Sequence, residues 1–383
     1  VTEHFESSRK ETAEIRLSLI QTYLDLEDIN NKDFSSLLND EYYSFSQNIF
    51  SEFLVMKILI AGRKREFDTI PGLLKQLDQI DEAQISESNS LRIEFYRIYY
   101  LGNLGSKEGV MAMSRDLVNL LKTFPKDQTS EVREIKSEIL NTLGGALLGD
   151  RLQDTEAIFY LDKRLNIFIG NDVVEDKLSR EERKELLDKV ISNFGEMTLH
   201  DKKGLCFTLN YYGRTFFYIG ELDQSEAFLE ESSKINKKLG DIQGFIRAND
   251  SLSKTLFTKA KALTSENASD DKTDKISNLL INSLEHAYIS FSESSYYSKI
   301  PEQAFALESF LRAYNLLASI INDNKETKTA NNKLKEIISN FESDLQKVES
   351  KRIFNKEQLE ELIIEIKDAT EGIKLMDILK HNF

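Results

Sequence analysis

Apolar residues recur at helical spacing along most of the chain. In the first such segment, residues 12–26, the apolar side chains stand two to three positions apart, which is typical of a half-buried helix. Short polar turns, several of them containing glycine, separate the later segments of the same kind. The pattern predicts helices joined by short turns. The apolar segments of the N-terminal third are residues 12–26, 45–61, 67–77, 91–101 and 110–121.

The C-terminal part follows a very polar stretch, residues 265–274, which we expect to be a loop. Pro301 fits the first turn of a helix, and Asn355 with Gln358 three residues later forms a capping box for the last helix. The last helix has a continuous apolar stripe, which either closes the fold or pairs with a second chain. The expected helices are residues 275–292, 301–321, 328–348 and 356–379.

Two segments, residues 139–172 and 209–241, share one pattern. Both carry Leu-Asn-x-x-Gly in a first helix, Glu-Ala in a second helix and a closing Gly followed by Asn or Asp. Thirteen residues separate the alanine from the closing glycine in each copy, so two anchors at matching offsets predict an internal repeat. A capping box from Ser179 to Glu182 predicts an extra helix between the copies.

Close packing explains the shared residues. A glycine in the first helix, Gly144 or Gly213, lets the second helix approach, and we expect Ala157 or Ala227 to fit the opposing notch. The closing glycines are suited to the left-handed conformation that ends a helix. One hairpin cannot bury both of its apolar faces, so such units occur in stacks. The closing glycines are Gly170 and Gly240.

The second copy resembles the tetratricopeptide repeat in its longer, roughly 40-residue variant. Ser225 replaces the usual alanine, Tyr212 replaces a usual leucine, and the closing proline is absent. The resemblance implies an all-α fold, a right-handed α-solenoid of helical hairpins with a C-terminal helical cap; the alternative is generic hairpins without the superhelix. The matching residues are Gly213, Phe216, Gly220, Leu222, Ser225, Leu229 and Ser232.

Four regions follow from this interpretation. The first is a group of N-terminal helices, either a bundle or a first hairpin, and the second is the repeat array. A polar loop then precedes a C-terminal helical region. Their bounds are residues 1–62, 63–264, 265–274 and 275–383.

Composition agrees with a helical fold. Among 383 residues, 40% are hydrophobic and 30% charged, which allows a large core, while three prolines and 16 glycines are too few for a turn-rich β fold. The net charge of −15 repels nucleic acid, and the short basic clusters have acidic neighbours. We therefore expect no direct binding to nucleic acid.

The single cysteine, Cys206, has apolar neighbours and cannot form a disulfide within the chain, which favours a reducing compartment. No apolar run is long enough to span a membrane and no signal peptide is present, so we expect a cytoplasmic protein without membrane contact. The first residue is Val1, and we expect the gene product to extend before it.

Patterns that carry chemistry are missing from the sequence. The four histidines stand far from one another and no cysteine pair accompanies them, so no zinc site is predicted. His286 reads as a packed or surface histidine of a helix. Glycine-rich phosphate loops are absent. We expect no catalytic residues, no metal and no cofactor, and hence no enzyme.

The resemblance implies that the first helices of the repeats line a concave groove. An asparagine there can hold the backbone of an extended peptide, and arginine or lysine can pair with a carboxylate. The alternative is that these residues are ordinary polar positions on a solvated surface. The candidate partner-binding residues are Asn141, Asn210, Arg214, Phe217, Arg247, Asp250 and Lys254.

The expected function is a non-catalytic interaction module or scaffold that binds a protein or peptide partner in this groove. The alternative is a peptide-sensing regulatory protein of the bacterial quorum-sensing receptor type, or a regulatory domain of a larger signalling protein. Self-association through the last helix is a further expectation. An unchanged shape on binding a partner would favour the scaffold, and a gain in thermal stability with a short peptide would favour the sensor.

Overall fold

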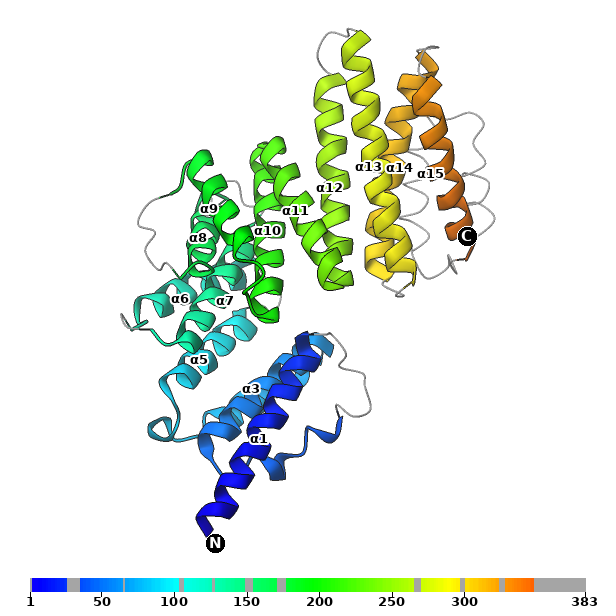
Figure 1. Cartoon of the computed structure of the whole chain (residues 1–383). Helices are drawn as coiled ribbons and strands as arrows, with labels where there is room; N and C mark the ends of the chain where they lie inside the picture. The colour runs from blue at the N-terminus through cyan, green and yellow to red at the C-terminus, as the bar shows by residue number, and fades with distance from the viewer. Residues whose placement is uncertain are drawn as a thin grey trace. The chain divides into compact units, whose positions relative to one another are not determined.

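The fold is helical throughout the part of the chain that the computed structural model describes (Figure 1). No strand occurs within these residues, and the predicted all-α class is therefore confirmed for them. The predicted helix 356–379, with its cap at Asn355, lies outside the described residues. The described residues are 2–25, 35–64, 66–102, 107–125, 128–148, 154–170, 177–264, 270–296, 300–323 and 328–347.

The chain forms two compact units. The N-terminal unit comprises residues 1–147 and 155–202, and the C-terminal unit comprises residues 148–154 and 203–383. The helices of the N-terminal unit are α1 (Thr2–Asp25), η1 (Asp40–Tyr42), α3 (Gln47–Lys64), η2 (Phe67–Thr69), α4 (Ile70–Leu77), η3 (Glu82–Gln84), α5 (Glu87–Gly102), α6 (Lys107–Lys122), α7 (Ser130–Ala146), α8 (Asp154–Ile167) and α9 (Arg180–Ser192).

Helix α3 forms the centre of the first unit because it is apolar on nearly every side. Phe53 and Ile60 pack in one cluster with residues of α1, whereas Leu54 and Ile58 pack in a second cluster with α4, α5, α6 and α7. A helix that is hydrophobic all round must be covered on both sides. Each such buried side chain contributes about 1.5–3 kcal/mol to the free energy of folding.

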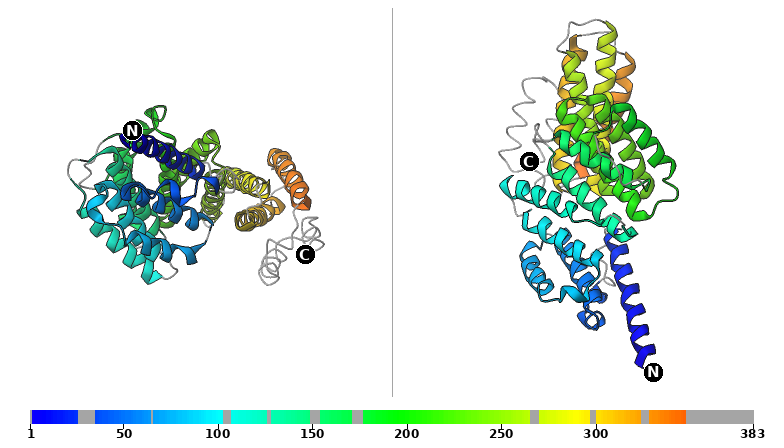
Figure 2. Two further views of the ribbon diagram at one scale, coloured as in Figure 1. Left: turned by 90° about the horizontal axis from the view of Figure 1, so that it is seen from below. Right: turned by 90° about the vertical axis from the view of Figure 1, so that its left-hand side faces the viewer.

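The C-terminal unit is a row of antiparallel helices. Helix α12 contacts α11, α13 and α14, and α13 contacts α14 and α15, so neighbours and next neighbours pack together (Figures 1 and 2). This order of contacts is typical of stacked helical hairpins. The helices are α10 (Leu199–Ile219), whose residues 199–202 belong to the N-terminal unit, α11 (Leu222–Leu239), α12 (Ile242–Thr264), α13 (Asp270–Tyr296), α14 (Ile300–Asp323) and α15 (Lys328–Lys347).

The start of α13 differs from the sequence expectation. The helix begins at Asp270, so residues 270–274, which were expected in the polar loop, are helical. Acidic residues are favourable at the N-terminus of a helix, where the backbone N–H groups carry partial positive charge. The polar composition of residues 270–274 therefore indicates a loop, although their acidic side chains also favour the start of a helix. Pro301 lies in the first turn of α14, as predicted.

The two predicted glycine notches are present. Gly213 on α10 faces Leu229 on α11, and the leucine side chain fills the space that a β-carbon would need. Gly144 on α7 faces Leu161 on α8 in the same way. Both leucines are completely buried. The glycines therefore allow close helix packing, as the sequence pattern indicates.

The residue that faces each glycine is a leucine, so the prediction that Ala157 and Ala227 fit the notches is wrong. Ala157 is fully buried, but Ala227 is exposed on the surface of α11. Leu229 follows Leu161 by 68 residues, and the residue 68 positions after Ala157 is Ser225, which is completely buried. The shared Glu-Ala pair therefore does not mark equivalent positions.

Left-handed backbone ends the helices where the sequence predicts it. Gly170 has a φ of 74° and Gly240 a φ of 68°, and Gly220 adopts the same region in the turn between α10 and α11. A residue with a β-carbon is strained there. The Gly240 N–H bonds the last carbonyls of α11, which completes the helix end.

Hydroxyl pairs join neighbouring helices inside the C-terminal unit. Ser225 on α11 lies 2.9 Å from Thr255 on α12, between their hydroxyl oxygens. Ser253 on α12 lies 3.1 Å from Ser283 on α13, and Ser283 also donates to the Ser253 carbonyl. These pairs are buried and satisfied, so they do not incur the cost of isolated polar groups.

Candidate functional site on helices α10, α12 and α14

The predicted residues of α12 share its polar face. Arg247, Asp250 and Lys254 stand three and four positions apart, which places them on one side of the helix. Arg247 and Lys254 are exposed and Asp250 is partly buried. The remaining face carries buried residues such as Ile246 and Leu252, which pack against neighbouring helices. The helix is therefore amphipathic, with the predicted site on its outer side.

Asp250 is the centre of the contacts on this face. One carboxylate oxygen accepts a bond from Lys254 Nζ at 2.7 Å, and the other accepts one from the Ser309 hydroxyl on α14 at 3.1 Å. Lys254 Nζ also lies 5.3 Å from the centre of the Phe305 ring. The ring is 53% exposed. An ammonium group and an aromatic face therefore lie side by side at the surface, joined by a cation–π contact.

Phe305 and Ser309 were not predicted from the sequence. They stand four residues apart on α14, so they share one face of that helix, which contacts α12. The polar stretch 265–274 indicates a separate C-terminal region, so the repeat pattern in the sequence ends before these two residues. The amphipathic pattern of the helices after residue 274 is the signal that points to Phe305 and Ser309.

The predicted residues of α10 lie deeper. Asn210 is only 9% exposed, and its Nδ2 has no hydrogen-bond partner within the described residues. Arg214 and Phe217 are half-buried, and the Phe217 ring meets the edge of Tyr218. A buried amide without a partner is rare and calls for an explanation.

Asn141 repeats this feature on α7. It is half-buried, and its Oδ1 is a buried atom that likewise lacks a partner in the described part of the chain. Asn141 precedes Gly144 by three residues, as Asn210 precedes Gly213. Asn141 belongs to the N-terminal unit, and the other six predicted residues belong to the C-terminal unit.

A second polar network links α11, α12 and α13. Asn249 donates from Nδ2 to the Ser233 hydroxyl at 3.1 Å and to the Phe245 carbonyl at 2.8 Å, and its Oδ1 lies 2.8 Å from His286 Nδ1. The sequence interpretation of His286 as a packed helix histidine agrees with this position. These bonds connect α12 to α11 and to α13, on the side of α12 opposite its outer face.

Cys206 is buried among α10 side chains. Burial, followed by the negative charge of Asp241, raises the pKa of its thiol to about 12. A reactive cysteine needs a lowered pKa, since the thiolate is the nucleophile. The thiol therefore acts as a packing group, as its apolar sequence neighbours indicate.

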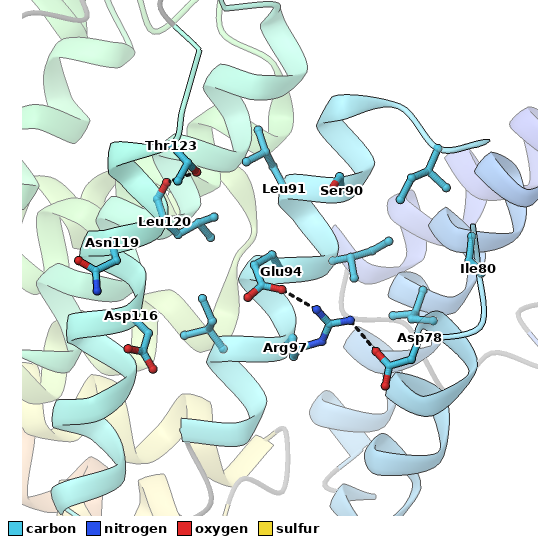
Figure 3. A pocket seen from close by; sticks show the side chains of 14 residues that line it. Asp78, Ile80, Ser90, Leu91, Glu94, Arg97, Asp116, Asn119, Leu120 and Thr123 are labelled. Carbon is cyan, nitrogen blue, oxygen red and sulfur yellow. Dashed lines mark hydrogen bonds and ion pairs between the residues drawn. The ribbon is translucent and has the colours of Figure 1, made fainter. Parts of the chain in front are cut away.

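The N-terminal unit contains a cleft of about 810 Å³ between the end of α4, α5 and α6 (Figure 3). Arg97 projects into it and donates to Glu94 at 2.5 Å and to Asp78 at 2.6 Å. Asp116 and Asn119 of α6 lie on the opposite wall. The guanidinium is compensated by its two carboxylates, which is typical of a surface ion network of small net energy.

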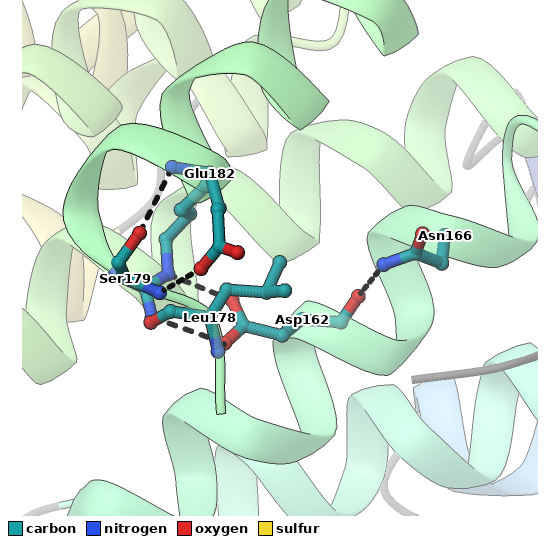
Figure 4. A network of polar contacts seen from close by, with 6 residues as sticks. Asp162, Asn166, Leu178, Ser179 and Glu182 are labelled. Carbon is teal, nitrogen blue, oxygen red and sulfur yellow. Dashed lines mark hydrogen bonds and ion pairs between the residues drawn. The ribbon is translucent and has the colours of Figure 1, made fainter. Parts of the chain in front are cut away.

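Helix α9 is fixed to α8 by a buried ion pair (Figure 4). Arg183 donates to both carboxylate oxygens of Asp162, at 2.7 and 3.0 Å, and both side chains are almost fully buried. The predicted capping box is confirmed, because Ser179 and Glu182 bond reciprocally at the start of α9. The pair is bidentate, the geometry in which a buried ion pair is best compensated.

No protein-family model matches the chain, and no curated protein matches its sequence. No described helix combines the length and the apolar composition that crossing a bilayer requires. A function therefore rests on the residues of α10, α12 and α14.

Proposed function

We propose that the chain is a non-catalytic protein-interaction module of the tetratricopeptide type, which binds an extended peptide segment of a partner protein. The right-handed solenoid that the repeat resemblance implies is part of this proposal. The partner segment lies along the first helices of the hairpins, α10, α12 and α14. The observation that carries the proposal is the buried amide of Asn210, whose Nδ2 has no partner within the described residues.

An unpartnered buried donor costs about 1–3 kcal/mol of stability. Because the Asn210 Nδ2 atom is buried, the side chain turns outward to meet a ligand, and an acceptor on the ligand then removes this cost. Asparagine offers one donor side and one acceptor side, which match the C=O and N–H of a peptide unit. Because the amide meets the backbone and not a side chain, Asn210 favours an extended peptide of varied sequence.

The α12–α14 face supplies the specific contacts. Asp250 and Phe305 hold the Lys254 ammonium group in place before a ligand arrives, so less side-chain freedom is lost on binding. The ammonium group attracts a carboxylate, and the exposed Phe305 ring packs against an apolar side chain. The preferred segment therefore has a carboxylate next to an apolar residue. The net charge of −15 disfavours a strongly acidic segment.

A random short-peptide library displayed on phage, selected against the full chain, provides the test. Selected peptides are synthesised with a fluorophore, and their Kd is measured by anisotropy. Asn210→Ala and Lys254→Glu are expected to raise the Kd about tenfold or more, which corresponds to about 1.4 kcal/mol. Lys275→Glu, an exposed residue of α13 with the same charge change, is the matched control and is expected to keep the wild-type Kd.

Peptides whose affinity is the same for the wild type and both site variants would overturn the site. Circular dichroism of each variant establishes that the helices are intact. Small-angle scattering of the complexes separates the two expected functions. A scaffold keeps its dimensions when the peptide binds, whereas a peptide-sensing regulator changes them.

A further inference from the structure

Three ionisable side chains of the N-terminal unit meet at one point. Glu134 and Glu138 stand four residues apart on α7, so they project from the same face. His200, in the first turn of α10, approaches both: its Nε2 lies 3.3 Å from Glu134 Oε1 and 3.6 Å from Glu138 Oε1. One ligand atom from each residue lies within 4.8 Å of the other two. All three side chains are partly buried.

These separations match the geometry of a tetrahedral metal site. Zinc binds imidazole nitrogen and carboxylate oxygen at about 2.1 Å, so neighbouring ligand atoms of a tetrahedral site lie about 3.4 Å apart. The two distances from His200 Nε2 are close to this value. The third edge, between the two glutamate oxygens, is no longer than 4.8 Å.

The charges favour a divalent cation. Two carboxylates four residues apart on a helix repel each other, and a protonated imidazole supplies one positive charge against two negative ones. Arg92 adds positive charge near Glu134 and Asp201 adds negative charge. A divalent ion with a neutral imidazole cancels both carboxylates.

An outer contact orients one of the glutamates. The Tyr96 hydroxyl on α5 donates to Glu138 Oε2 at 3.1 Å, which leaves Oε1 directed toward His200. Groups that ligate metals commonly have such a second hydrogen bond, which fixes the ligand in place. Tyr96 is itself buried, so its hydroxyl has a fixed position.

We propose that Glu134, Glu138 and His200 bind a divalent transition-metal ion, with Zn²⁺ as the best match. An imidazole nitrogen favours zinc over Mg²⁺ and Ca²⁺, which prefer oxygen ligands alone. Three protein ligands leave a fourth position for water. The ion ties α7 to the first turn of α10, so it stabilises the fold of the N-terminal unit.

This site is not visible in the sequence because its ligands come from two distant helices. Glu138 and His200 are 62 residues apart, and the site has a single histidine and no cysteine. Motif searches for zinc depend on pairs of histidines or cysteines at short spacing. Helix packing alone brings these three residues together.

Zn²⁺ titration by calorimetry tests the site, with the 383-residue chain first treated with EDTA. One ion per chain is expected to bind the wild type, and excess Mg²⁺ is not expected to compete. His200→Ala and Glu134→Gln are expected to weaken binding at least about tenfold. Glu131→Gln, an exposed position one turn earlier on α7, removes the same charge and is expected to bind like the wild type.

Cobalt spectroscopy of the wild type adds a measurement that needs no variant. Co²⁺ in this site is expected to give the strong visible bands of tetrahedral coordination, and Zn²⁺ is expected to displace it. Wild-type affinity in His200→Ala and Glu134→Gln would place the ion elsewhere. A wild-type chain that binds neither ion would show that the three residues form an ion pair only.

Discussion

Gly213 on α10 and Leu229 on α11 share one packing site, in which the leucine occupies the volume that a side chain on residue 213 would need. Gly144 and Leu161 form the same relationship in the N-terminal unit. Both glycines lie inside helices, where glycine costs about 1 kcal/mol relative to alanine. The close approach of the paired helices compensates for that cost.

Gly213→Val is therefore expected to overpack the site. The free energy of unfolding should fall by about 1–3 kcal/mol, since fully buried Leu229 has little room to move. Urea unfolding followed by circular dichroism measures the change. Ala227→Arg is the control, because Ala227 is exposed and substitutions at such positions usually stay within about 0.5 kcal/mol.

A second substitution checks the contact itself. Leu229→Ala in the Gly213→Val background removes the atoms that clash, so it should cost less than Leu229→Ala alone. If the two substitutions are simply additive, or if Ala227→Arg destabilises as strongly as Gly213→Val, the packing site is assigned wrongly.

The Asp162–Arg183 pair is expected to show strong coupling. Arg183→Met leaves the Asp162 carboxylate buried without its guanidinium, and removing one partner of a buried pair typically costs about 3–5 kcal/mol. The double variant Asp162→Leu with Arg183→Met replaces both charges with apolar groups and should cost clearly less than Arg183→Met. Equal losses in the single and double variants, measured by urea unfolding, would speak against a buried pair.

Acid is expected to weaken the start of α9. The backbone N–H of Ser179 and its side chain stabilise the ionised Glu182 and lower the pKa of its carboxyl group below the ordinary value of 4.5. A lowered folded-state pKa contributes stability that is fully present above the unfolded-state pKa. This contribution disappears as the pH falls through the folded-state value.

Unfolding experiments between pH 6 and pH 3 measure this contribution as the difference between wild type and Glu182→Gln. The glutamine variant should lose less stability on acidification, because its amide does not titrate. Glu181→Gln removes the same charge beside the cap and should keep the wild-type loss. Identical pH profiles for wild type and Glu182→Gln would contradict the prediction.

Local chemistry explains which parts of the fold were predictable. Ser179 with Glu182, and Gly240 at the end of α11, specify helix ends through bonds to nearby backbone groups. The position of Ala227 was not predictable from its dipeptide. A shift of two residues turns a helix position by about 200°, so Ser225 faces inward where Ala227 faces solvent.

The candidate site was predictable only along a single helix. Helical spacing alone places Arg247, Asp250 and Lys254 on one face, and that arrangement needs no knowledge of neighbours. Phe305 and Ser309 reach Asp250 and Lys254 only because α14 packs beside α12. Such long-range contacts depend on which helices pair and at what height, and neither quantity is encoded by spacing within one helix.

The hydroxyl pairs between α11, α12 and α13 restrict how this part of the protein can move. Ser225 and Thr255, or Ser253 and Ser283, meet at only one axial alignment of their helices. Sliding α12 by a turn along both α11 and α13 would separate these four buried oxygens from their partners on the neighbouring helix, at a cost for each group left unpaired. Sliding of these helices along one another is therefore disfavoured, so a change in the angle between two helices is the motion that keeps each hydroxyl pair together.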